Sequence, residues 1–338
     1  MFLRRVWTAC FAAALATPAL AVTITDHTLA RPEGARHYIA VEAEGKPKAR
    51  RPVLILLHGH GASAAIMVGL ASLGGYKTDA WSNLAERENI LLLAPDGVTA
   101  SDGKKAWNDC RSDAPTNTTV DDVGLLAALI DTAIAQFDAD PERVYVYGVS
   151  HGGAMTYRAA IELGPRLAAI GVQSGLMAAQ NACPAPSVPL SVFIEHGTAD
   201  EIVPYAGGKA GSWFLKGRGT TIGAEQSAAV WRKLAGLPEA AATYRFPHLR
   251  PDDPTSATRY VWGAGPAGLQ VEFLRIGGGG HVEAAKNGTL PWLLRKLVGD
   301  MNHDLDTAEE AWSFLKTKRN SSVQTAGVRS DKRTRTQP

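Results

Sequence analysis

The chain of 338 residues lacks several features that would assign it quickly to a class of protein. Lysine and arginine number 35 and aspartate and glutamate 33, so the net charge of +2 gives no reason to expect nucleic acid or an anionic membrane as a partner. There is no internal repeat, and after the first 21 residues no apolar run is long enough to cross a bilayer. Hydrophobic residues make up 45% and charged residues 20%, which is typical of one large or two small globular domains.

Cysteine is scarce as well, with three in the whole chain. The first residues combine a basic start, an apolar stretch and a closing Ala-Leu-Ala, so we expect residues 1–21 to be a cleaved export signal. The exported chain then keeps Cys110 and Cys183. An even number of cysteines outside the cytosol favours one disulfide, with two free thiols as the alternative. These patterns predict a secreted or periplasmic protein without a membrane anchor.

Short apolar runs alternate with segments of helical periodicity along the rest of the chain. The apolar runs predict strands at residues 35–42, 53–57, 90–94, 144–147, 168–172, 190–195 and 271–276. The helical patterns cover residues 123–137, 151–162, 226–237 and 307–316. Thr307 and Glu310 stand at capping-box spacing at the start of the last of them. Short strands buried on both faces and separated by helices predict a mostly parallel sheet flanked by helices.

The connections between these segments indicate how the chain is organised. Residues 175–190 form a short, proline-rich link with no room for a large lid, whereas a longer insertion spans residues 201–270. Residues 317–338 are polar and basic with almost no apolar side chain, so we expect a disordered tail. A single catalytic domain should therefore occupy residues 22–316.

The motif Gly-Val-Ser150-His151-Gly lies between an apolar strand and a helix. A Gly-x-Ser-x-Gly pattern alone is a weak signal, but this setting is typical of a nucleophile elbow, a strained turn that lifts a serine above the carboxyl edge of a sheet. Ser150 is therefore the candidate nucleophile. Neighbouring side chains on so sharp a turn point apart, so we expect His151 to contribute only its backbone N–H, at an oxyanion hole.

A serine nucleophile needs a histidine base and an acid that orients it, and the chain offers nine histidines. His281 directly follows the last predicted strand in a run of four glycines, which we expect to form a flexible loop at the carboxyl edge of the sheet. Asp200 follows the preceding strand, with Glu195 and Glu201 as neighbouring alternatives. The chain order serine, aspartate, histidine is typical of an α/β-hydrolase triad.

The turn His58-Gly59-His60-Gly61 follows the strand at residues 53–57. In an elbow enzyme the second oxyanion donor comes from this loop, and the backbone N–H of His60 is the first candidate, with that of Gly59 next. Two histidines separated by one residue are alternatively typical of a pair of metal ligands, but no third ligand is placed nearby. We therefore expect neither a metal ion nor an organic cofactor.

Taken together, these motifs resemble the exported α/β-hydrolase esterases known as polyhydroxybutyrate depolymerase-like or feruloyl esterase-like. The matching stretches include LLHGHG, WSNLAERENILLLAPDG, VDDVGLLAALID, DPERVYVYGVSHGGAMTYRAA, IEHGTADEIVPY and GGGGH. The resemblance implies an α/β-hydrolase fold with Ser150 as nucleophile, Asp200 as acid and His281 as base. It also implies that Trp107 lines the acyl pocket, although simple packing is an equal alternative for a tryptophan.

The expected activity is a serine esterase that cleaves small or oligomeric carboxylic esters, such as hydroxyalkanoate oligomers and feruloyl or other aryl esters, through an acyl-enzyme. One departure from the family concerns the residues after His281, where an aromatic residue and a proline are common and this chain has Val282-Glu283-Ala284. Two other functions stay open at this point: a serine peptidase of the same fold, and a catalytically silent binding protein built on it.

Overall fold

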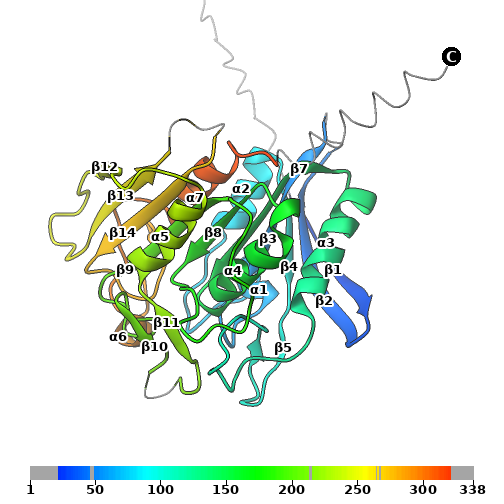
Figure 1. Ribbon diagram of the computed structural model, residues 1–338, viewed down its shortest axis with the longest axis horizontal. Coiled ribbons are helices and arrows are strands. Elements are labelled where there is room, and N and C mark those ends of the chain that lie inside the picture. Colours follow the sequence, from blue (N-terminus) through cyan, green and yellow to red (C-terminus); the bar gives the residue numbers. More distant parts are fainter. Residues whose placement is uncertain (1–21, 46–48, 213–214, 264, 266–267, 321–338) are drawn as a thin grey trace, which may run out of the picture.

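The computed structural model describes residues 22–45, 49–212, 215–263, 265 and 268–320. Its centre is a ten-stranded sheet in the order β1-β2-β4-β3-β7-β8-β9-β14-β13-β12 (Figure 1). The stretch from β4 to β14 is parallel, and both edges are antiparallel. The strands of this sheet are β1 Val22–Arg31, β2 Gly34–Ala43, β3 Arg51–Leu57, β4 Leu91–Pro95, β7 Ala139–Val149, β8 Ala169–Gln173, β9 Ser191–Gly197, β12 Ala242–Arg245, β13 Ser256–Trp262 and β14 Val271–Gly277.

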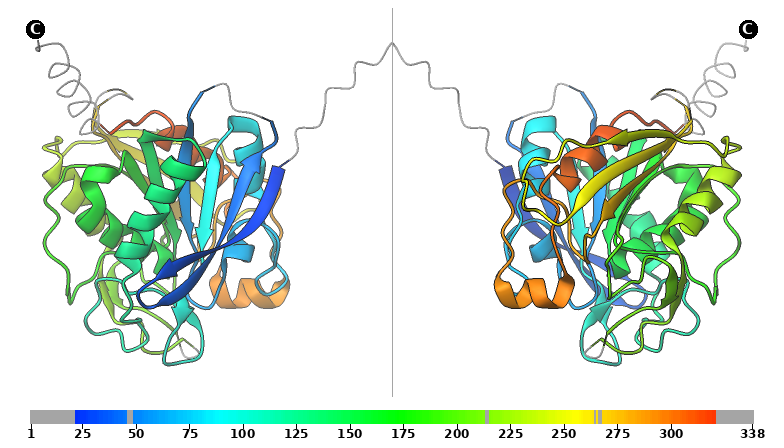
Figure 2. Two further views of the ribbon diagram at one scale, coloured as in Figure 1. Left: turned by 90° about the vertical axis from the view of Figure 1, so that its right-hand side faces the viewer. Right: turned by 90° about the vertical axis from the view of Figure 1, so that its left-hand side faces the viewer.

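Helices cover both faces of the sheet, as Figures 1 and 2 show. One buried core joins the sheet to α3 Asp122–Gln136, α4 His151–Leu163 and α5 Ala224–Leu234. The other joins it to α1 Ala64–Met67, α2 Ala80–Glu88 and α7 Thr307–Leu315. The remaining elements are two small hairpins, a 3-10 turn and a short helix: β5 Val98–Thr99 with β6 Lys105–Ala106, β10 Gly207–Lys209 with β11 Thr220–Ile222, η1 Gly164–Arg166 and α6 Trp292–Val298.

The predicted parallel sheet between helical layers is confirmed. Every residue of β3, β4, β8 and β9 is buried, which is why these strands appear in the sequence as continuous apolar runs. Strands β1, β12 and β13 were not predicted from the sequence. They lie at the edges, where one face meets solvent and polar residues interrupt the apolar pattern.

The capping-box prediction for the last helix is wrong. Asp306, not Thr307, is the N-cap residue of α7, and its side chain makes no capping hydrogen bond. Thr307 is instead used in a tertiary contact, because its Oγ1 accepts a hydrogen bond from the backbone N–H of Ala284 at 2.8 Å. The hydroxyl therefore ties α7 to the loop after β14 rather than closing its own helix.

The predicted disordered tail, residues 317–338, was placed a few residues too early in the sequence. Lys318 and Asn320 are buried, and the Asn320 side chain donates to the carbonyl of Pro165 at 2.8 Å. Lys318 Nζ donates to Gln270 Oε1 at 2.7 Å, and its carbonyl accepts from the hydroxyl of Tyr145. Polar side chains thus pack against the end of the sheet through hydrogen bonds that composition does not reveal. The rest of the predicted tail, and the predicted signal at residues 1–21, lie outside the described residues.

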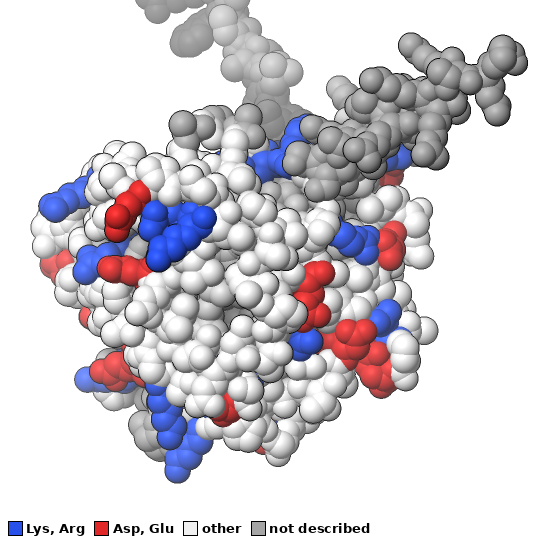
Figure 3. Space-filling view, viewed as in Figure 1, with Lys and Arg blue, Asp and Glu red and all other residues white. Residues whose placement is uncertain are grey.

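The carboxyl ends of the parallel strands meet at one edge of the sheet, the lower edge in Figure 1, where α6 and the β10–β11 hairpin also lie. The hairpin belongs to the predicted insertion between β9 and β14, which also contains α5, β12 and β13. Charged residues of both signs are scattered over the face drawn in Figure 3, with uncharged areas between them. No helix in the described part of the chain is long and apolar enough to cross a membrane.

Candidate active site

Ser150 lies on a strained turn between β7 and α4. Its backbone has φ 56° and ψ −116°, a left-handed conformation that is costly for a residue with a side chain. The flanking glycines make the turn possible. A Cβ on Gly148 would lie 2.1 Å from the carbonyl oxygen of Gly152, and one on Gly152 would lie 2.2 Å from that of Leu57. The two glycines of the motif are therefore required by close packing of the backbone, as a nucleophile elbow demands.

Three side chains from distant parts of the sequence meet at this turn. His281 Nε2 lies 2.8 Å from Ser150 Oγ, and His281 Nδ1 lies 2.7 Å from Asp200 Oδ2. Both distances are hydrogen bonds of ordinary length. The structure thus brings together the three residues that the chain order singled out. The hydrogen bonds run from the serine through the histidine to the aspartate.

Asp200 is held rigidly as an acceptor. Its Oδ1 accepts hydrogen bonds from the backbone N–H groups of Ile202 at 2.9 Å and Val203 at 2.8 Å. Burial alone would raise the pKa of Asp200, but the adjacent imidazole of His281 and these hydrogen bonds keep that pKa below its usual value. The alternative acids differ: Glu201 is exposed, and burial raises the pKa of Glu195 to about 8.

The four glycines before His281 were expected to make a flexible loop, and the structure gives two of them a packing role instead. A Cβ on Gly280 would lie 2.0 Å from the carbonyl oxygen of Val298, and one on Gly279 would lie 2.4 Å from the side chain of Ile276. The backbone N–H of His281 donates to the carbonyl of Val298 at 2.6 Å. Close backbone contact with the end of α6 therefore fixes the position of His281.

The two residues proposed to donate to an oxyanion both lie at the cavity that contains Ser150. His60 and His151 both line the cavity at the serine, and neither backbone N–H donates to another backbone group in the described part of the chain. Gly59, the residue before His60, lies close to the serine, because a Cβ there would lie 3.4 Å from Ser150 Cβ. This arrangement is compatible with an oxyanion hole built from backbone amides.

The side chains of His60 and His151 form a second polar cluster that the sequence did not predict. Their rings stack with centroids 5.5 Å apart, and His151 Nε2 lies 3.2 Å from Asp109 Oδ2. His60 Nδ1 accepts from Arg218 Nη1 at 2.6 Å, so Nε2–H is the nitrogen that donates to Asp102 Oδ2 at 2.9 Å. No spacing in the sequence links these residues, because four separate loops and the start of α4 supply them.

Electrostatics keep this second pair of histidines neutral. Burial and the positive charge of Arg218 together lower the pKa of His60 to about 4. Burial also lowers the pKa of His151, although Asp109 opposes the effect. Asp109 itself is completely buried, and its neighbours Arg111 and His151 hold its pKa well below the usual value against the effect of burial. Rings whose pKa is lowered in this way are weaker bases than an ordinary histidine.

Trp107 does not line the cavity. It is fully buried, and its indole N–H donates to the carbonyl oxygen of His58 at 2.8 Å, so packing describes its position better than substrate contact. His58 is buried as well: its Nδ1 bonds to the carbonyl of Gly59 and its Nε2 accepts from the backbone N–H of Gly97. His58 and His60 thus face different partners. Within the described ranges, no group of three or more metal-binding side chains is assembled.

Cys110 and Cys183, which are 73 residues apart in the sequence, form a disulfide. Cys110 lies between Asp109 and Arg111, whose side chains are joined by hydrogen bonds at 2.8 Å. The predicted disulfide is therefore present, next to the cluster that holds His151.

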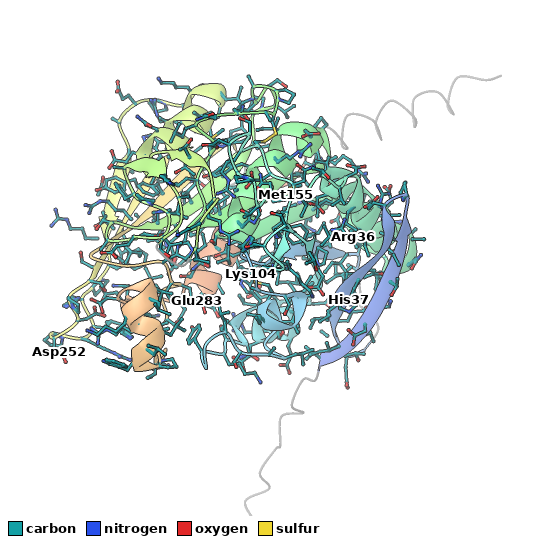
Figure 4. All side chains as sticks on the ribbon, turned by 90° about the horizontal axis from the view of Figure 1, so that it is seen from below. Arg36, His37, Lys104, Met155, Asp252 and Glu283 are labelled. Carbon is teal, nitrogen blue, oxygen red and sulfur yellow. A yellow bond between two sulfur atoms is a disulfide. The ribbon has the colours of Figure 1, made fainter. Side chains whose placement is uncertain are left out.

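A cavity of about 500 Å³ opens at Ser150 and His281. Figure 4 looks onto this edge of the molecule and labels Lys104 and Glu283 near its middle. Most of the wall is apolar, contributed by Ile66, Met67, Leu73, Leu176, Ile202, Val203, Leu215, Leu294, Leu297 and Val298. Such a wall suits the hydrocarbon part of an ester.

Comparison with known proteins decides the family. Residues 37–225, more than half of the chain, match the phospholipase/carboxylesterase family, a range that contains Ser150 and Asp200. The chain belongs to this family. It is therefore a carboxylic ester hydrolase of the α/β-hydrolase fold, and the expected similarity to polyhydroxybutyrate depolymerases and feruloyl esterases is confirmed.

Individual relatives of this carboxylesterase are distant. The chain is 27% identical over 273 residues to NocK of Nocardia uniformis subsp. tsuyamanensis, which is provisionally named an esterase, and the match covers 78% of this chain and 74% of that one. It is 28% identical over 213 residues to feruloyl esterase B of Piromyces equi, covering 62% of this chain but only 36% of that larger protein. The acetyl xylan esterase of Aspergillus awamori shares the fold with a TM-score of 0.53 at 15% identity, covering 87% of this chain and 99% of that one.

Proposed function

We propose that this carboxylesterase cleaves its substrates through an acyl-enzyme formed on Ser150. As Ser150 Oγ attacks the ester carbonyl, His281 Nε2 takes the hydroxyl proton, and Asp200 holds the opposite N–H of the ring and stabilises the imidazolium. The backbone N–H groups of His60 and His151 donate to the oxyanion. The proton then passes from His281 to the leaving alcohol, and water activated by the same histidine releases the acid.

One observation carries this proposal: the continuous pair of hydrogen bonds from Ser150 through His281 to Asp200, at 2.8 and 2.7 Å. A binding protein that only used the fold would need none of the three residues in this arrangement, nor a strained backbone at the serine. A serine peptidase would use the same three residues, so substrate assays must separate the two.

The proposed substrates are carboxylic esters with an apolar acyl or aryl part, such as hydroxyalkanoate oligomers and feruloyl esters. The apolar cavity and the name of the Piromyces relative support this range. We further propose that residues 1–21 direct export to the periplasm or the medium, which fits the disulfide, since such bonds persist in oxidising compartments.

The test compares wild type with Ser150→Ala on p-nitrophenyl esters of increasing chain length, methyl ferulate, hydroxybutyrate oligomers and a peptide p-nitroanilide. Ester turnover that disappears in the variant supports the proposal. Ester turnover that survives in Ser150→Ala overturns it, and peptide cleavage in place of ester cleavage favours the peptidase.

A further inference from the structure

The charged groups on the wall of the cavity are all basic. Lys104, Arg111 and Arg218 line it together with the histidines and the apolar residues, and no aspartate or glutamate among the described residues does. Arg111 is neutralised by the buried carboxylate of Asp109, which its Nη2 contacts within 2.5 Å. The two basic groups that no buried carboxylate neutralises are Lys104 and Arg218, whose partner Asp102 is partly exposed.

Arg218 is built into the wall. It is 7% exposed, and Arg111 Nη1 donates to its carbonyl oxygen at 2.5 Å, which fixes its backbone. Its Nη1 donates to His60 and to Thr116, and its Nη2 donates to Asp102 Oδ2 at 3.0 Å. The Nε–H is buried and has no hydrogen-bond partner among the described residues. A guanidinium has five N–H donors, and one left without an acceptor in a buried wall is costly unless a ligand accepts it.

Two other polar groups share this wall with Arg218. Thr221 is 3% exposed, and its Oγ1 also has no partner in the part of the chain that the structure describes. Lys104 is exposed and lines the cavity, its Cδ lies 3.3 Å from the position of a Cβ on Gly61, and its Nζ makes no ion pair with a described residue. Figure 4 shows Lys104, in projection, between Met155 of α4 and Glu283 of the loop after β14.

We propose that Arg218, Thr221 and Lys104 form a subsite for a carboxylate of the substrate, so that this esterase prefers esters bearing a negative charge at one end. Among the described residues, Asp102 is the only carboxylate paired with Arg218, which leaves the Nε edge of the guanidinium, the hydroxyl of Thr221 and the ammonium of Lys104 for the substrate. The apolar part of the cavity holds the chain between this carboxylate and the scissile ester. The subsite rests on the proposed chemistry at Ser150 and adds a substrate class to it.

The test uses two pairs of ester probes that differ only in a charge. In one pair the charge is on the acyl side: the mono-p-nitrophenyl ester of glutaric acid and the same compound with its free carboxylate methylated. In the other it is on the alcohol side: 4-acetoxybenzoate and its methyl ester. For each pair the ratio of kcat/KM, charged over neutral, is measured in wild type, Lys104→Met, Thr221→Val and Arg218→Lys, so that differences in intrinsic reactivity cancel between proteins.

We expect a preference of at least about tenfold for the charged member of one pair in wild type, lost progressively in the three variants. Lys233→Met on the exposed side of α5 is the matched control and should keep the wild-type ratio. Equal turnover within both pairs in wild type overturns the subsite, as does a ratio that stays unchanged in Lys104→Met and Thr221→Val, which replace an exposed lysine and a single hydroxyl and should fold. Neutral probes cleaved equally by wild type and Ser150→Ala would instead refute the chemistry at the serine.

Discussion

Three histidines surround Ser150, and the two sides of the serine differ sharply. On one side His281 has a carboxylate at Nδ1 and the serine hydroxyl at Nε2. On the other side His60 has a guanidinium at Nδ1, and burial together with that charge lowers its pKa to about 4. A ring whose free nitrogen already accepts from a cation cannot collect a proton from serine. The comparison shows that the partners of a histidine, rather than its distance from a nucleophile along the chain, decide its role.

The largest expected effect on kcat comes from substitutions on the side of Ser150 where His281 is proposed to take the proton. Ser150→Ala and His281→Ala should each lower kcat on a p-nitrophenyl ester by about 10⁶-fold, because neither the nucleophile nor its base can be replaced by water. His248→Ala removes a histidine from a distant loop and should stay within about twofold of wild type. A similar loss in the control would mean that general destabilisation, not chemistry, explains the result.

Asp200→Asn should lower kcat by about 10⁴-fold, since the amide can no longer hold the ring in the tautomer that accepts the serine proton. Glu201→Gln changes the exposed neighbouring acid and should have almost no effect. Steady-state kinetics of the two variants decides between the acids that the sequence left open. The reverse order of effects would transfer the role to Glu201.

On the other side of Ser150, where His60 and His151 lie, substitutions should lower the stability of the protein more than they lower kcat. Cys110→Ser combined with Cys183→Ser should lower the free energy of unfolding by about 4 kcal/mol, the entropy of a loop spanning 73 positions, while leaving the triad in place. Urea unfolding of the oxidised and the double-serine proteins measures this difference. A double variant as stable as wild type would show that packing around Asp109 needs no covalent closure.

Asp109→Asn leaves Arg111 without its buried counter-charge and should cost about 3 kcal/mol of stability. Its effect on kcat should be about tenfold, far below that of Asp200→Asn, because His151 is expected to supply only a backbone donor. Kinetics and urea unfolding of the same preparation report both quantities. A loss of kcat equal to that of Asp200→Asn would give the second histidine pair a direct part in proton transfer.

The last effect concerns the dependence of stability on pH. His58 and His60 have a folded pKa of about 4 against about 6.5 in the unfolded chain, so between these values the unfolded state binds more protons than the folded state. Their contribution to stability is therefore complete above pH 6.5 and is lost as the pH falls towards 4. Urea midpoints at pH 7, 5.5 and 4.5 should fall, and less steeply in His60→Gln. Parallel declines in the two proteins would contradict a depressed pKa at His60.

Much of the architecture followed from local pattern. The parallel strands are buried on both faces, so their apolar runs are visible in the sequence, and the ends of those runs indicated Asp200 and His281. The edge strands β1, β12 and β13 were missed because partial exposure dilutes the pattern. Thr307 was misread as a cap and residues 317–320 as tail, because in both cases a tertiary hydrogen bond determines the position of a polar group.

The candidate active site likewise has features that the sequence indicated and features that only the structure revealed. The sequence by itself determined the elbow, its obligatory glycines and the order of the three residues now proposed as the triad, since each depends on strand ends and backbone geometry. Only the tertiary structure decided which histidines face carboxylates and which face cations, and why two of the glycines before His281 must be glycines. It also showed that, among the described residues, basic groups alone supply the charge on the cavity wall. Charges and close backbone contacts act between loops that are far apart in the sequence, so their effect exists only after the chain has folded.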